Sequence, residues 1–290
     1  MAYQGIRDLL RRAPPGAAAG PVLVLLAEDG VEIASTLRHH LSAGFRSVLL
    51  FASPHIALPR PLPPGVTPIR ADMAAPDAAQ VAVNAAIRLA PPGTWIGYVY
   101  NAEYLFHPFR ETRSVGEMLE FHAGERRDAM LTYVIDLYAG DLAASPDGVS
   151  DSDAHLDAEG YFALAREAGG GDAPPPERQL DFYGGLRWRF EEHVPPRRRR
   201  IDRIGVFRTQ RGLLMDADGL FNRAEYNTYS CPWHHNLTAA ICSFRAAKAL
   251  RSNPRSRHAV GTFLWHGSTP FSWHSQQLLD LGLIEPGQWF

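Results

Sequence analysis

Three continuous apolar runs dominate the first hundred residues. They lie at 21–27, 47–51 and 95–100, and each is aliphatic or aromatic along nearly its whole length. Runs without polar alternation are typical of strands buried on both faces, as in a parallel sheet. A shorter run at 66–70 predicts a further strand. The pattern therefore indicates a central sheet whose two faces are covered by helices.

Helical spacing appears between these runs. Apolar residues recur every four positions over 31–43, which predicts a helix that ends at Gly44. An alanine-rich segment over 76–89 predicts a second helix, and Pro91-Pro92-Gly93 stops it. Strand and helix thus alternate as in βαβ units, so we expect an α/β fold with a mostly parallel sheet.

Weaker patterns continue to the end of the chain. Ser114 and Glu117 form a capping-box sequence, which predicts a helix over 114–121. Asp216-Ala217-Asp218-Gly219 predicts a hairpin turn in preference to a metal motif. The remaining expected elements are a helix at 3–12, strands at 129–138 and 201–207, and helices at 236–250 and 275–281.

The alternation predicts one domain with two halves. Residues 1–140 carry the clear strand and helix pattern, whereas residues 141–290 are richer in loops. A stretch at 146–176 is acidic and contains many glycines and prolines. We expect it to be a long loop, and a loop of that length in a compact domain is usually functional or mobile.

Composition narrows the class of protein. Of the 290 residues, 46% are hydrophobic and 21% are charged, which is ordinary for a globular chain. The net charge of −2 gives no reason to expect a nucleic-acid partner. No apolar run approaches the length of a membrane span, Met1 to Arg12 lack a signal-peptide core, and two cysteines fit a reducing compartment. We therefore expect a cytoplasmic protein.

Several common site motifs do not occur. The sequence contains neither GxGxxG nor GxxxxGK, and it has no GxSxG elbow. Cys231, His234, His235 and Cys242 are potential zinc ligands, but their spacing fits no standard finger.

The most informative polar residues follow the strand at 95–100. Asn101 and Glu103 flank Ala102 where that strand should end. Ligands of open α/β sheets collect at the carboxyl ends of strands, and two oxygen-bearing side chains there can hold a hard cation or a ribose. The alternative is a turn begun by Asn101 with Glu103 in solvent, which the local residue types favour.

The segment from Leu25 to Pro108 resembles the nucleotide-binding half of bacterial glycosyltransferase family 2 proteins, which have the GT-A fold. The matching parts are Ala27-Glu28 after the first strand, His39-His40 and Gly44 at the helix end, and Trp95 followed by Tyr100-Asn101-Ala102-Glu103-Tyr104-Leu105. The Glu-aromatic-Leu ending of the family's Asp-Ala-Asp-Glu-Phe-Leu motif is kept. Both aspartates are replaced, by Tyr100 and Ala102, or by Asn101 and Glu103 in a register shifted by one. Arg203 to Arg208 and His234-His235 resemble later parts of the same group more loosely.

This resemblance implies a GT-A-like protein that transfers a sugar from a nucleotide diphosphate donor. The acceptor would be a glycan, a lipid-linked glycan or a protein in surface polysaccharide synthesis, with peripheral association at the inner face of the cytoplasmic membrane. The implied donor-binding residues are Ala27, Glu28, Phe51, Tyr100, Asn101, Glu103 and Arg208. Glu103 and His235 would hold Mg²⁺ or Mn²⁺, unless arginines such as Arg208 form a metal-free clamp.

Sugar transfer also requires a carboxylate that deprotonates the acceptor hydroxyl. The candidates in the aromatic stretch at 181–192 are Glu191, Glu192 and Asp181, of which we expect Glu191 or Asp181 to serve. A sugar can stack there on Tyr183 or Trp188. Ion pairs with nearby arginines are the structural alternative. Two rival functions remain open: a catalytically degenerate GT-A-like module that binds a glycan or protein, and, more distantly, a glycoside hydrolase.

Overall fold

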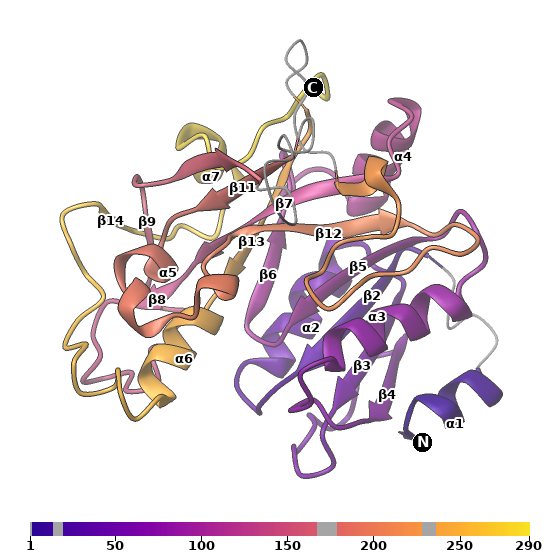
Figure 1. Cartoon of the computed structure of the whole chain (residues 1–290), viewed down its shortest axis with the longest axis horizontal. Helices are drawn as coiled ribbons and strands as arrows, with labels where there is room; N and C mark the ends of the chain where they lie inside the picture. The colour runs from indigo at the N-terminus through magenta and orange to yellow at the C-terminus, as the bar shows by residue number, and fades with distance from the viewer. Residues whose placement is uncertain (1, 14–19, 167–178, 228–235) are drawn as a thin grey trace, which may run out of the picture. The chain divides into compact units, whose positions relative to one another are not determined.

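The computed structural model describes residues 2–13, 20–166, 179–227 and 236–290. The fold is α/β, with a large mixed, mostly parallel sheet flanked by helices (Figure 1). Two compact units are present. The first comprises Met1–Leu105, Thr112–Leu131 and Ile204–Asn227, and the second comprises Phe106–Glu111, Thr132–Arg203 and Thr228–Phe290. The chain thus returns to the first unit after leaving it, so these units do not coincide with the expected halves at 1–140 and 141–290.

The first unit is built on parallel strands. Their order is β1-β4-β3-β2-β5, and β12 pairs with β5 in the antiparallel sense. Their bounds are β1 Tyr3–Gln4, β2 Val22–Ala27, β3 Ser47–Ala52, β4 Val66–Arg70, β5 Trp95–Tyr100 and β12 Asp202–Arg208. Every residue of β2 and β3 is buried, which explains why their sequences are apolar without alternation.

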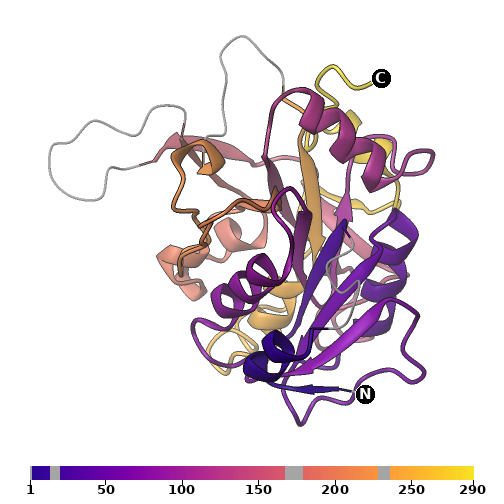
Figure 2. The same cartoon turned by 90° about the vertical axis from the view of Figure 1, so that its right-hand side faces the viewer.

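Helices cover both faces of these strands. Figures 1 and 2 show α2 (Ile33–Ala43) on one face and α3 (Ala78–Leu89) on the other. The buried side of α3 consists largely of alanines, which allow the helix to pack closely. The other elements of the first unit are α1 Ile6–Arg11, α4 Val115–Gly124, η3 Ala224–Asn227 and most of β6 Glu103–Phe106.

The second unit contains shorter elements. In it β7 (Ala129–Asp136) pairs in parallel with β13 (Ala239–Ser243). A second sheet has the order β14-β9-β8, and β10 forms a hairpin with β11. The other bounds are β8 Tyr138–Ala139, β9 Ala154–Asp157, β10 Phe162–Ala165, β11 Leu180–Tyr183, β14 Ser268–Pro270, α5 Leu186–Arg189, α6 Arg245–Ser252, α7 Ser275–Asp280, η1 Glu191–His193 and η2 Pro196–Arg198. Tyr138, Leu186 and Phe263 lie at the centre of its core.

Two sequence predictions were wrong. The helix expected over 236–250 is instead the strand β13 followed by α6. Its first part forms a strand because all five residues of β13 are buried beside β7, which overrides the helical preference of alanine. The loop expected at 146–176 contains β9 and β10, and residues 167–178 of it lie outside the described part.

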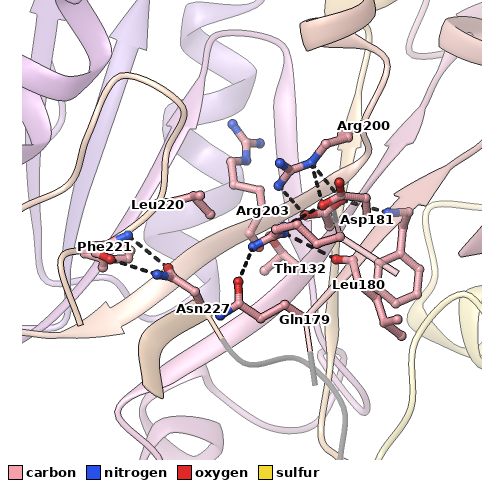
Figure 3. Close-up of polar contacts among 12 residues, drawn as sticks. Thr132, Gln179, Leu180, Asp181, Arg200, Arg203, Leu220, Phe221 and Asn227 are labelled. Carbon is pink, nitrogen blue, oxygen red and sulfur yellow. Dashed lines mark hydrogen bonds and ion pairs between the residues drawn. The ribbon is translucent and has the colours of Figure 1, made fainter. Parts of the chain in front are cut away.

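The other expected elements are confirmed to within a few residues at each end. The predicted hairpin turn is also confirmed, since Met215 bridges Phe221 and the Gly219 amide donates to the Asp216 carbonyl. Asn227 closes this hairpin from outside, because its side chain bonds both the amide and the carbonyl of Phe221 (Figure 3). In the described residues, no helix is both long enough and apolar enough to cross a bilayer.

The capping box of α4 gives a first test of local stability. The Glu117 amide donates to Ser114 Oγ at 3.3 Å, and the Ser114 amide donates to Glu117 Oε2 at 2.8 Å. We predict that S114A lowers the free energy of unfolding by about 1 kcal/mol, because helix amides lose their acceptor. Urea unfolding measures this. S42A is the control, because that exposed hydroxyl lies near the end of α2, caps no helix N-terminus and donates to the His39 carbonyl.

Candidate functional site

The parallel register of the first unit places the carboxyl ends of its strands side by side at one edge of the sheet. Leu26 of β2 is opposite both Phe51 of β3 and Tyr100 of β5, so these strands end at the same level. Five of the predicted donor-binding residues lie at or directly after these ends: Ala27, Glu28, Phe51, Tyr100 and Asn101. We call this the carboxyl edge, and it is where open α/β sheets bind ligands.

Arg208 does not lie at the carboxyl edge. The antiparallel register places it opposite Trp95, at the amino end of β5. Its guanidinium donates to the Gly93 carbonyl at 3.1 Å and lies 3.6 Å from Asp128. Arg208 therefore cannot belong to a metal-free clamp at the carboxyl edge.

Asn101 ties the turn after β5 to the turn after β2. Its Oδ1 accepts from the Glu28 amide at 2.9 Å, and its Nδ2 donates to Asp29 Oδ1 at 2.5 Å and to the Val31 carbonyl at 2.8 Å. The side chain is fully buried. These bonds occupy both amide donors, so Asn101 shapes the edge by holding the two turns together.

Glu103 lies inside the same turn. Its Oε2 accepts from the Tyr100 amide at 2.9 Å, and the side chain is buried. Between them, Ala102 adopts a left-handed φ of 60° while its amide donates to Thr36 Oγ1. The expectation that Glu103 is solvated was therefore wrong. Its predicted metal partner His235 lies outside the described residues, together with Cys231 and His234.

The groups exposed directly after β2 are acidic. Glu28 is exposed and Asp29 is partly exposed, and Asp29 Oδ1 also accepts from the Val31 amide. Among the described residues no cluster of three His, Cys, Asp or Glu side chains could hold a metal ion. A diphosphate at this edge would meet like charge, so its binding would require a cation that it brings with it.

A cavity of about 270 Å³ adjoins the carboxyl ends of β3 and β4. Phe51 and Met73 line it on the sheet side, and small alanines of the α3 region line the other side. Asp72 and Asp77 stand at its rim. The Met73 segment is held in place because its amide donates to Ser53 Oγ at 2.9 Å. The volume and the apolar lining suit one flat ring system with a polar group at its edge, because ligand pockets are mostly apolar with a few polar groups.

In the second unit, the expected base Asp181 belongs to an ion-pair network (Figure 3). Arg166 Nε lies 2.7 Å from its Oδ1, and Arg200 Nε lies 3.3 Å from the same atom. Both arginines also reach Asp202, at 3.2 and 2.6 Å. Two cations thus balance two carboxylates, which is the pairing that buried charges require.

The other expected base, Glu191, is more accessible. Its side chain is 56% exposed, and Arg199 Nη1 lies 2.9 Å from its Oε2. The same arginine donates to the Glu191 carbonyl at 2.9 Å. An exposed pair of this kind contributes little to stability, so Glu191 keeps a carboxylate that a ligand can reach.

Sequence reasoning gave no role to Asp136, a buried carboxyl group of the second unit whose pKa is raised. It ends β7 beside Ser243 of β13 and is buried. Its Oδ2 accepts from the Arg187 amide at 3.2 Å, and Arg187 Nε lies 3.2 Å from Oδ1. Burial raises the pKa of this carboxyl to about 6, although Arg187 opposes the shift. The one sequence signal is an acid at the end of an aliphatic strand.

Gly185 is required beside Asp136. A Cβ atom at this position would lie 2.9 Å from Asp136 Oδ2, and the residue has a φ of 66°. Both the contact and the left-handed backbone exclude a side chain. The adjacent Gly184-Gly185 pair in the sequence therefore permits the burial of this carboxyl group.

Asp157 is buried and accepts hydrogen bonds from three side chains. Arg189 binds it with two nitrogens, at 2.8 and 3.1 Å. The Tyr138 hydroxyl donates to its Oδ1 at 2.5 Å, and the Trp265 indole donates to the same oxygen at 2.9 Å. This set of donors makes Asp157 an anchor for the surrounding aromatic side chains.

Comparisons with known proteins identify no relative. No protein-family model, no curated protein and no solved structure matches this chain.

Replacing Asn101 tests the tie between the two turns. In N101D, the introduced carboxyl would face Asp29 Oδ1 and the Val31 carbonyl, where two amide donors now lie. We predict a loss of at least about 2 kcal/mol in the free energy of unfolding near neutral pH. The folded state raises the pKa of the new carboxyl, so the loss shrinks as pH falls. N253D, at an exposed asparagine whose Oδ1 accepts from the Arg255 amide as an aspartate oxygen would, should change stability by less than about 1 kcal/mol in the same urea assay.

The pKa of Asp136 predicts a pH dependence of stability. Its folded pKa of about 6 lies above the ordinary value of 3.8 for an aspartate, so the stabilisation by the protonated form is complete below about pH 4. It is lost as pH rises through about 6, and we expect a change on the order of 2–3 kcal/mol. D136N should remove this dependence in urea titrations across that range, whereas the exposed control D218N should keep it. Identical pH profiles for the wild type and D136N would contradict the assignment.

Proposed function

We propose that this chain is a nucleotide-sugar-dependent glycosyltransferase of GT-A type whose first unit binds the nucleotide diphosphate donor. The observation that carries the proposal is the carboxyl edge of β2, β3, β4 and β5, where turn residues and a cavity of about 270 Å³ adjoin the same strand ends. This is the position at which open α/β sheets bind nucleotides. The sequence resemblance to glycosyltransferase family 2 supports the same activity.

The donor fits the edge in two parts. The cavity beside Phe51 accepts the base, and Asp72 at its rim accepts hydrogen bonds from the base or the ribose. The diphosphate lies nearer Glu28 and Asp29 and carries Mg²⁺ or Mn²⁺, because the exposed groups there are acidic. A cation held there would also offset the charge that develops on the leaving diphosphate.

The transfer itself exchanges one bond for another. An acceptor hydroxyl attacks the anomeric carbon of the donor sugar, the bond from that carbon to the diphosphate oxygen breaks, and a carboxylate takes the hydroxyl proton. Of the two expected bases, Glu191 has an exposed carboxylate, whereas Asp181 is held by two arginines. The acceptor class remains a glycan, a lipid-linked glycan or a protein.

One observation favours a second function. Asn101 and Glu103 replace the metal-binding aspartates of the family that the chain resembles, and both make hydrogen bonds within the turns. A GT-A-like module that has lost catalysis and binds a glycan or protein would retain the fold with such a closed turn. This module would not respond to nucleotide or to metal.

Calorimetry with UDP and GDP separates the two functions. We predict that one of them binds in the presence of Mn²⁺ and that EDTA weakens the binding at least about tenfold. D72N should weaken it by about tenfold through the loss of a charged acceptor at the cavity rim. D218N, on the hairpin of the same unit, is the matched control and should leave affinity unchanged.

Donor hydrolysis then tests catalysis. We expect Mn²⁺-dependent release of nucleotide diphosphate from at least one common nucleotide-sugar, and E191Q should slow it at least about a hundredfold. Nucleotide binding without turnover of any donor would keep the nucleotide site and overturn the transfer reaction. The absence of both binding and turnover would overturn the proposal.

A further inference from the structure

Several exposed aromatic and aliphatic side chains of the second unit form one group. Phe162 is 40% exposed and Trp188 is 41% exposed, and Trp265 is partly exposed beside them. We call these three residues the aromatic surface. Leu164, 56% exposed, lies two residues after Phe162, and Leu264, 41% exposed, directly precedes Trp265. Exposed groups of large apolar side chains usually mark a binding site.

The rings of the aromatic surface are neighbours. Phe162 meets Trp188 edge to face at a centroid distance of 5.8 Å and stacks on Tyr183 at 5.4 Å. A Cβ atom on Gly160 would lie 3.5 Å from Trp188 and 3.6 Å from Trp265. Both indoles therefore border the space beside Gly160, and the missing side chain leaves their edges uncovered.

Trp265 is held in a fixed orientation. Its indole N–H donates to Asp157 Oδ1 at 2.9 Å, and the Arg189 guanidinium lies 5.0 Å from its ring centroid. Arg189 is itself held by two bonds to Asp157. A ring fixed in this way loses little conformational entropy when a ligand binds, which favours affinity.

The charged groups around the aromatic surface are paired. Arg189 is paired with Asp157, and Arg187 is paired with Asp136. The exposed Glu159 and His266 lie 3.8 Å apart and supply hydrogen-bonding groups without a large net charge. A surface of this kind does not attract an anionic membrane or a polyanion. Its charge suits a neutral ligand that has an apolar face and hydroxyl groups at its rim.

We propose that the aromatic surface binds a neutral oligosaccharide, with the C–H faces of its sugar rings on Phe162 and Trp188 and its hydroxyls near Glu159 and His266. The role of this oligosaccharide as acceptor rests on the proposed glycosyltransferase function, but its binding does not. The aromatic surface is therefore an acceptor subsite in the second unit, separate in the chain from the nucleotide-binding edge.

Binding to neutral glycans provides the test. The full chain is titrated with cellohexaose, maltohexaose and chitohexaose, and binding is followed by calorimetry and by protection of tryptophan fluorescence from acrylamide. We expect at least one hexasaccharide to bind and to protect the fluorescence. W188A should weaken that binding at least about tenfold, and W188F should restore most of it because an aromatic face remains.

Two controls keep the outcome interpretable. L214A removes an exposed apolar side chain of the first unit and should bind the glycan like the wild type. W188A should unfold in urea at the wild-type midpoint, which shows that the variant is folded, and its titration with UDP or GDP and Mn²⁺ should match that of the wild type.

Each result has a definite meaning. If none of the three hexasaccharides binds, or if W188A binds as well as the wild type, the inference is overturned even when nucleotide binding is intact. Binding to phosphatidylglycerol vesicles in place of glycans also overturns it and assigns the surface to lipid. Glycan binding that depends on Trp188, without nucleotide binding, upholds the inference and removes the proposed transferase.

Discussion

The structure of the first unit depends on the parallel pairing of β2 with both β3 and β5. A strand buried on both faces can satisfy its backbone groups only through its neighbours, so the register of the three strands is set together. Because the three strands pair without an offset at their carboxyl ends, these ends lie at one level and the turns that follow them are adjacent. Asn101 fastens two of these turns, and the cavity beside Phe51 opens at the same edge.

The two units differ in the partners of their buried polar and charged side chains. The first unit buries polar groups of the Tyr100–Glu103 turn in hydrogen bonds and leaves carboxylates exposed at its edge. The second unit buries carboxylates next to arginines, as in the pairs of Asp157 with Arg189 and Asp202 with Arg200. Burial with partners fixes the surrounding side chains in place, which is how Asp157 orients Trp265. An exposed acidic edge instead favours a ligand that arrives with a cation.

The sequence predicted the fold more reliably than the site. The strand over 95–100 and the capping box at Ser114 are local signals, and both are present in the structure. The helix expected over 236–250 failed because burial beside β7, which is distant in the sequence, decided the conformation of 239–243. Contacts between distant segments also explain why the sequence did not indicate Asp136. Its raised pKa comes from enclosure by residues around 185 and not from its sequence neighbours.

The sequence by itself determined the α/β class, the first strands and helices, and the polar turn at Asn101. Periodicity and capping act within a few residues, so they can be read along the chain. Only the tertiary structure decided that Glu103 is buried, that Arg208 lies at the amino end of β5, and that Phe162 and Trp188 share one exposed surface. These properties depend on strand register and on contacts between segments far apart in the sequence, which no local pattern encodes.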